Sequence, residues 1–161
     1  MKLTFPGTRG EIDEKTDRHR RHTNLLVTYR RRRVLVDCGA DWRGEIDRLN
    51  PHAIVLTHAH PDHAFGLADG VPDDCPVYAT DVTWNDIDHY PIGRRHTVEP
   101  NARFEVEGIG FEAFTVEHSV NCPAVCYRIQ AGRPTVLYCP DVVYIHDRDR
   151  AMDGAALYVG D

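Results

Sequence analysis

The residues best suited to chemistry lie at positions 58–63, His-Ala-His-Pro-Asp-His, where three imidazoles and one carboxylate fall within six residues. Neutral imidazoles and carboxylates are ligands that suit Zn²⁺, Mn²⁺ or Fe ions. On a strand-to-helix turn, His58 and His60 point the same way, whereas Asp62 and His63 reach a second position. The spacing therefore predicts one loop that serves two metal ions, about 3.5–4 Å apart and sharing a hydroxide. A histidine-rich surface loop is the weaker alternative.

An apolar strand must position this loop. Residues 53–56, Ala-Ile-Val-Leu, are apolar at every position, which predicts burial on both faces of a sheet. The run ends directly at Thr57 and His58. The carboxyl end of a buried strand is where α/β proteins tend to place a site.

Short β-type segments recur along the chain, and most are bounded by Gly, Pro, Asn or Asp. Strands are predicted at residues 3–5, 25–29, 34–36, 53–57, 77–79, 103–106, 111–116, 124–129, 135–138 and 155–159. Helices are predicted at residues 43–49, 63–68 and 81–89. The pattern indicates a mixed α/β fold, and residues 1–161 have the length of a single domain without repeats or linkers.

The composition is typical of a globular protein, with 42% hydrophobic and 27% charged residues. No apolar run approaches the roughly 20 residues that cross a bilayer, and the N-terminus lacks a signal-peptide core, so a cytoplasmic protein without a membrane partner is expected. The cysteines are odd in number and form no Cys-x-x-Cys pair, which predicts reduced, partly buried thiols. They stand at positions 38, 75, 122, 126 and 139.

The net charge of −6 conceals a basic N-terminal segment, because residues 1–33 hold ten Lys and Arg against four Asp and Glu. Arg18, Arg20, Arg21 and the run of residues 30–33 could meet the phosphates of a nucleic acid or a nucleotide. The alternative is a solvated hairpin whose arginines pair with the acidic remainder of the surface. The hairpin is slightly favoured, because residues 29–33 lie between two strand-like runs.

The pattern His-x-His-x-Asp-His at residues 58–63 resembles the signature of the metallo-β-lactamase superfamily, and the resemblance extends over nearly the whole chain. It implies a four-layer αββα sandwich with two divalent metal ions, Zn²⁺ first and Mn²⁺ or Fe as alternatives. Residues 114–119, Phe-Thr-Val-Glu-His-Ser, match the element whose histidine, here His118, completes a three-imidazole set. Residues 136–141, Val-Leu-Tyr-Cys-Pro-Asp, match the strand whose aspartate, here Asp141, bridges both metals.

Residues 34–39, Val-Leu-Val-Asp-Cys-Gly, resemble the early strand of the superfamily that ends in aspartate. The resemblance implies that Asp37 supports a metal ligand, although a turn residue before Gly39 is the alternative. Taken singly, His118 could be a core histidine and Asp141 a capping residue. Histidines that match no ligand position are expected to be solvated or structural, namely His22, His52, His89, His96 and His146.

Two further segments resemble the branch of the superfamily that includes tRNase Z and the cyclic phosphodiesterases. They are residues 5–10, Phe-Pro-Gly-Thr-Arg-Gly, and residues 118–119 with 125–129, Val-Cys-Tyr-Arg-Ile. The resemblance implies hydrolysis of a phosphodiester, with Asp62 orienting the nucleophile or taking its proton. Alternatives are a thioester or ester hydrolase of the same superfamily, and a non-catalytic metal-binding or structural partner.

Members of the superfamily supply one more histidine on a late strand, and this sequence shows none beyond His146. The resemblance therefore predicts that the second half of the sandwich lacks its C-terminal strands and covering helix. Three alternatives stay open: the chain is a fragment, a complementing chain supplies the remainder, or a homodimer covers the gap. The first metal site would be complete, whereas the second, left with Asp62, His63 and Asp141, would be weak.

Overall fold

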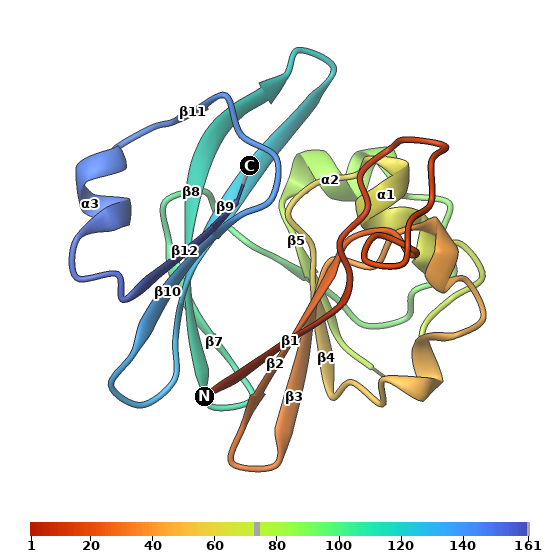
Figure 1. Ribbon diagram of the computed structural model, residues 1–161, viewed down its shortest axis with the longest axis horizontal. Coiled ribbons are helices and arrows are strands. Elements are labelled where there is room, and N and C mark those ends of the chain that lie inside the picture. The colour runs from red at the N-terminus through yellow and green to blue at the C-terminus, as the bar shows by residue number, and fades with distance from the viewer. Residues whose placement is uncertain (73–74, 161) are drawn as a thin grey trace.

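The computed structural model describes residues 1–72 and 75–160 and contains two six-stranded sheets that pack face to face (Figure 1). All ten predicted strands are confirmed. The first sheet has the order β1-β2-β3-β4-β5-β6, antiparallel from β1 to β3 and parallel from β3 to β6. Its strands are β1 (Lys2–Gly7), β2 (Asn24–Tyr29), β3 (Arg32–Val36), β4 (Ala53–Val55), β5 (Val77–Ala79) and β6 (Arg95–Thr97).

The second sheet has the order β11-β8-β9-β10-β12, with β7 paired to β8. Only β10 and β12 run parallel; the other pairs are antiparallel. Its strands are β7 (Arg103–Val106), β8 (Ile109–Ser119), β9 (Cys122–Gln130), β10 (Thr135–Cys139), β11 (Tyr144–Ile145) and β12 (Leu157–Gly160). The strands β6 and β11 were not predicted.

Strand β4 is completely buried, as its apolar sequence predicted, and its two faces contact different cores. Ile54 belongs to the cluster under the helices, whereas Ala53 and Val55 belong to the cluster between the sheets. Leu56 continues the buried run to the loop that begins at Thr57. A strand fixed on both faces gives the following loop a rigid starting point.

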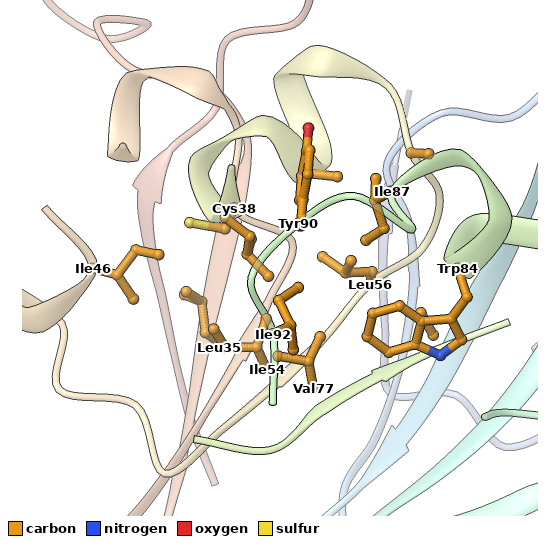
Figure 2. Close-up of a cluster of buried hydrophobic side chains, with 14 of the residues drawn as sticks. Leu35, Cys38, Ile46, Ile54, Leu56, Val77, Trp84, Ile87, Tyr90 and Ile92 are labelled. Atoms are coloured by element: carbon orange, nitrogen blue, oxygen red, sulfur yellow. The ribbon is translucent and has the colours of Figure 1, made fainter. Parts of the chain in front are cut away.

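Three buried clusters define four layers. The first lies between the first sheet and the helices outside it and includes Leu35, Leu56 and Trp84 (Figure 2). The second fills the space between the two sheets. The third lies on the outer face of the second sheet, where helix α3 (Arg148–Met152) contributes Ala151. The four-layer αββα arrangement is confirmed; the absence of further strands and a covering helix stays a prediction.

The helices outside the first sheet are shorter than predicted. The predicted helix at residues 43–49 is shortened to one 3-10 turn, η2 (Ile46–Arg48), because Gly44 has φ +69°. Another 3-10 turn, η1 (Ala40–Trp42), precedes it. The predicted helix at residues 63–68 is α1 (Pro61–Ala64) followed by the 3-10 turn η3 (Phe65–Leu67). The third is α2 (Asp81–Asp86), capped by the Thr80 hydroxyl.

The β2–β3 hairpin confirms the predicted turn at residues 29–33, with Arg30 and Arg31 both at positive φ. Arg32 pairs with Glu107 at 3.2 Å, as expected for a hairpin whose arginines meet acidic groups. Among residues 1–72 and 75–160, no helix is both long and apolar enough to cross a lipid bilayer. The five cysteines are buried and unbridged, which confirms the expected thiols.

Candidate metal centre

The loop after β4 and the first turn of α1 carry the four clustered ligand candidates. His60 is extended at the helix N-cap, and Pro61 takes the N1 position, which its fixed φ favours. Helix α1 therefore begins two residues earlier than predicted, and Asp62 and His63 both lie in its first turn. His58 and His60, before the helix, fall in one group of ligand candidates, and Asp62 and His63, within it, fall in another.

The first group of ligand candidates joins the two sheets. It comprises His58, His60, His118 and Asp141, whose ligand atoms all lie within 4.8 Å of one another. His118 Nε2 lies 3.0 Å from His60 Nδ1 and 3.3 Å from Asp141 Oδ2. His58 Nε2 lies 3.6 Å from the same carboxylate oxygen. The structure brings together the four side chains that the sequence assigned to the first metal.

The second group comprises Asp62, His63 and Asp141. His63 Nε2 lies 3.2 Å from Asp62 Oδ2 and 3.3 Å from Asp141 Oδ2. Asp141 is thus common to both groups, which is the position predicted for a bridging carboxylate. Within the described residues this group has three members, one fewer than the first.

Asp37 supports the site through hydrogen bonds to His63 and Thr57. Its side chain is fully buried and accepts a hydrogen bond from His63 Nδ1 at 2.9 Å. It also accepts from the backbone N–H of Thr57 at 2.8 Å and from the Thr57 hydroxyl at 2.9 Å. The Thr57 hydroxyl lies 3.0 Å from His58 Nδ1. Asp37 therefore fixes the ring of one ligand candidate directly and reaches another through Thr57, a residue that the sequence analysis did not single out although it precedes His58.

The electrostatics of the site act in opposite directions on its two buried histidines, His58 and His63. Burial, followed by the neighbouring His63, lowers the pKa of His58 to about 2, so its imidazole is neutral. Burial acts against charge on His63, but Asp37, Asp141 and Asp62 together raise its pKa well above 6.5. Burial raises the pKa of Asp141, but His63, His58 and His118 outweigh it and lower that pKa to about 2. The carboxylate is ionised at neutral pH.

Two buried nitrogen atoms show that the residues fit metal ions. Nε2 of His58 and Nε2 of His63 are both buried, and neither has an acceptor or donor in hydrogen-bonding geometry. Leaving such atoms without partners costs about 1–3 kcal/mol each. A divalent cation in each group would bind these nitrogen atoms, with release of the proton that the three carboxylates favour on His63, and would relieve the crowding of imidazoles around Asp141. Metal ligation by the six residues remains a prediction that this donor set supports.

Gly39, just before η1, lies between helix α1 and His22 of the loop that joins β1 to β2. A Cβ placed on Gly39 would lie 2.1 Å from the carbonyl oxygen of Asp62 and 2.3 Å from Cβ of His22, so only glycine fits there. Arg9 is 4% exposed and pairs with Asp41 in η1. Asp41 also accepts from the backbone N–H of His22 at 2.9 Å. No local pattern in the sequence indicates this pairing, because Arg9 and Asp41 lie 32 residues apart.

The histidines that matched no ligand position lie outside both groups of ligand candidates. His22 Nδ1 lies 3.1 Å from Asp41, and His52 Nδ1 accepts from the backbone N–H of Arg33 at 3.3 Å. His96 stacks on Tyr78 with ring centroids 4.5 Å apart.

Comparison with known proteins gives relatives of different lengths. An exodeoxyribonuclease YycJ of Bacillus anthracis is 27% identical over 151 residues, which cover 84% of this chain and 56% of that protein. An octanoyltransferase of Porphyromonas gingivalis is 29% identical over 140 residues, which cover 73% of this chain and 28% of that protein. The chain thus spans little more than half the length of one relative and about a quarter of the other.

Solved structures show the same fold. A diphosphatase of the PhnP family superposes with a TM-score of 0.76 at 24% identity, covering 97% of this chain and 71% of that one. The short form of human tRNase Z superposes with a TM-score of 0.68 at 18% identity, covering 97% of this chain and 76% of that one. At these identities the likeness shows the fold alone.

A family model described as the beta-lactamase superfamily domain matches residues 32–161, which include β3, the loop at residues 58–63 and the strands that carry His118 and Asp141. The chain therefore belongs to the metallo-β-lactamase superfamily of hydrolases.

Proposed function

We propose that this protein hydrolyses a phosphodiester with the help of two divalent metal ions, Zn²⁺ first and Mn²⁺ or Fe as alternatives. The observation that carries the proposal is the pair of ligand groups that share Asp141. Two adjacent sites joined by one carboxylate are the arrangement that phosphoester-cleaving metalloenzymes use to hold the attacking and the leaving oxygens together.

The chain's own residues would divide the work. His58, His60, His118 and Asp141 would hold one ion, and Asp62, His63 and Asp141 the other. The bound ions would supply a water of lowered pKa and neutralise charge on the phosphoryl oxygens. Asp62 is 3% exposed and has one carboxylate oxygen 3.2 Å from His63 Nε2. Its other oxygen is the group on this chain that would orient the attacking water or accept its proton.

The names of the similar proteins support a phosphoester substrate. They include an exodeoxyribonuclease, a ribonuclease Z of Bradyrhizobium diazoefficiens that is 36% identical over 70 residues, and a diphosphatase. The octanoyltransferase does not fit this chemistry, and its match covers 73% of this chain and 28% of that protein, against 40% and 22% for the ribonuclease Z. The substrate of this chain is inferred from the shared donor set rather than from any one relative.

The test is turnover of bis(p-nitrophenyl) phosphate with added Zn²⁺ or Mn²⁺. His60→Ala removes a ligand of the first group, and we expect its rate to fall by at least about 100-fold. His89→Ala is the matched control, because His89 lies outside both groups with a side chain that is 71% exposed. Equal rates for wild type and His60→Ala would refute metal-dependent hydrolysis at this site.

Two further measurements separate the alternatives. Metal analysis of protein purified without chelator should give about two ions per chain, whereas one or none together with no turnover would favour a non-catalytic partner. Turnover of a glutathione thioester that exceeds turnover of the phosphodiester would favour a thioester hydrolase.

A further inference from the structure

The loop of residues 10–21 is clamped at both ends. The backbone N–H of Arg9 donates to the carbonyl of Arg21 at 2.9 Å, and the N–H of Thr23 donates to the carbonyl of Arg9 at 3.1 Å. The indole N–H of Trp42 donates to the carbonyl of His22 at 2.9 Å. With the buried pair of Arg9 and Asp41, these bonds fix the base of the loop to η1. The 10–21 loop is thus held as a unit and not a free tail.

The base of the loop lies beside the metal centre. A Cβ on Gly10 would be 3.8 Å from Asp62 Oδ2, which places the start of the loop against one ligand candidate. Thr8 and Pro140 line the same cavity of about 240 Å³, and Pro140 directly precedes Asp141. In Figure 1 the loop lies next to α1. Residues 8–10 therefore lie close both to Asp62 and to the residue that precedes Asp141.

Most cations of this loop are already neutralised. Lys15 pairs with Asp41 at 3.2 Å, and Arg20 pairs with Asp17 at 2.6 Å. Arg21 pairs with Glu45 at 3.1 Å and lies over the Trp42 ring. The loop's other carboxylates, at positions 11, 13 and 14, belong to its first half. A phosphate could recruit any of these paired cations only by separating it from its partner.

Arg18 is the exception. Its guanidinium has no hydrogen-bond or ion-pair partner within residues 1–72 and 75–160, although its backbone is fixed. The Thr8 hydroxyl donates to the carbonyl of Arg18 at 3.2 Å, and His19 Nδ1 lies 2.9 Å from that hydroxyl oxygen. The result is an exposed, unpaired guanidinium on a backbone that is bonded to the base of the loop.

We propose that Arg18 binds a second phosphate group of the substrate, next to the phosphodiester that reacts at the metal centre. The proposal rests on the proposed function and narrows it to substrates with more than one phosphate, such as an oligonucleotide. The guanidinium presents a planar fork of donors that matches two phosphate oxygens at once. Since Arg18 has no carboxylate to leave, binding a phosphate costs it only hydration and side-chain entropy.

The test compares two chromogenic substrates that differ by one phosphate. They are thymidine 5′-(p-nitrophenyl phosphate) and the same compound with a 3′-phosphate, both assayed with the metal-loaded protein. We expect Arg18→Ala to lower kcat/KM about tenfold more for the 3′-phosphorylated substrate, a difference of about 1.4 kcal/mol. Arg18→Lys should recover part of this loss, because it keeps the charge without the fork.

Arg133→Ala is the matched control, since Arg133 is an exposed arginine in the turn between β9 and β10. An equal loss for both substrates, or an equal loss in Arg133→Ala, would overturn the assignment. Binding of thymidine 3′,5′-bisphosphate by calorimetry needs no turnover. If wild type cleaves neither substrate but Arg18→Ala still binds the bisphosphate about tenfold more weakly, the proposed function fails and the subsite stands. Equal binding by wild type and Arg18→Ala refutes the subsite.

Discussion

The replacement Asp37→Asn tests how the site orients its ligands. Asp37 has φ +61°, a left-handed conformation that asparagine tolerates, so the substitution changes charge and donor pattern with little change of backbone. The amide oxygen can still accept from Thr57. The amide NH₂, however, now faces His63 Nδ1, which donates to Asp37 in the wild type at 2.9 Å. His63 must then carry its proton on Nε2, the atom that faces Asp62 and Asp141.

Two magnitudes follow from this geometry. Loss of the charge-assisted bond costs about 1.5–3 kcal/mol of the free energy of unfolding, offset in part because a neutral amide is easier to bury than a carboxylate. Loss of a partner that orients a metal-binding histidine typically weakens metal affinity about 10- to 100-fold. Only the second ligand group contains His63, so the first should keep its affinity.

The assay is a chelator-competition titration with Zn²⁺ or Mn²⁺, with urea unfolding measured in parallel. We expect one tight and one weakened site in Asp37→Asn. Asp88→Asn is the control, because that carboxylate is 76% exposed and lies outside both ligand groups. Two equivalents of metal bound by Asp37→Asn with wild-type affinity would refute the argument that Asp37 sets the proton position on His63.

Two other predictions concern Gly39 and Asp41, which both contact His22 in the loop between β1 and β2. Gly39→Ala places a Cβ 2.1 Å from the Asp62 carbonyl oxygen, and we expect it to lower the free energy of unfolding by about 2–3 kcal/mol. Gly93→Ala, whose Cβ meets nothing within 4 Å, is its control in urea unfolding, and equal stabilities would contradict the prediction. Burial raises the pKa of Asp41, but hydrogen bonds from Arg9 and Lys15 outweigh it and lower that pKa to about 2. Because the pKa is depressed, the stabilisation is complete above the ordinary value of 3.8 and is lost as the pH falls through about 2. Asp41→Asn should therefore be less stable than wild type by about 1 kcal/mol at pH 7, after allowance for solvent screening. In unfolding measured against pH, a difference that does not shrink between about pH 4 and pH 2 would contradict the assignment.

The strands were predictable because most of them bury apolar side chains in a regular pattern. Strand β6 was not predicted, because Arg95, His96 and Thr97 are all exposed and show no alternation of buried and exposed side chains. It forms because its backbone pairs with β5, an interaction between residues that no local pattern reveals. The predicted helix at residues 43–49 was wrong for the opposite reason. Its composition suits a helix, but Gly44 takes a positive φ, and only Ile46–Arg48 form a helical turn.

The site was predictable in part from spacing and in part only from resemblance. Four of the ligand candidates were predictable because they lie within six residues, namely His58, His60, Asp62 and His63. His118 stands 58 residues from His60, and only the superfamily pattern indicated that their rings would meet. Thr57 and the pair of Arg9 and Asp41 were not foreseen, since common residue types that act by supporting others leave no distinctive spacing.

The shared carboxylate of Asp141 implies that metal binding would also stabilise the packing of the two sheets. His58, His60, Asp62 and His63 follow a strand of one sheet, whereas His118 and Asp141 belong to strands and a loop of the other. An ion bound by both sets links the two halves of the sandwich, and its binding free energy adds to the free energy of docking one half on the other. The free energy of packing one sheet on the other would then depend on the metal concentration. Removal of the metal by a chelator would weaken the contact between the sheets before it unfolded either of them.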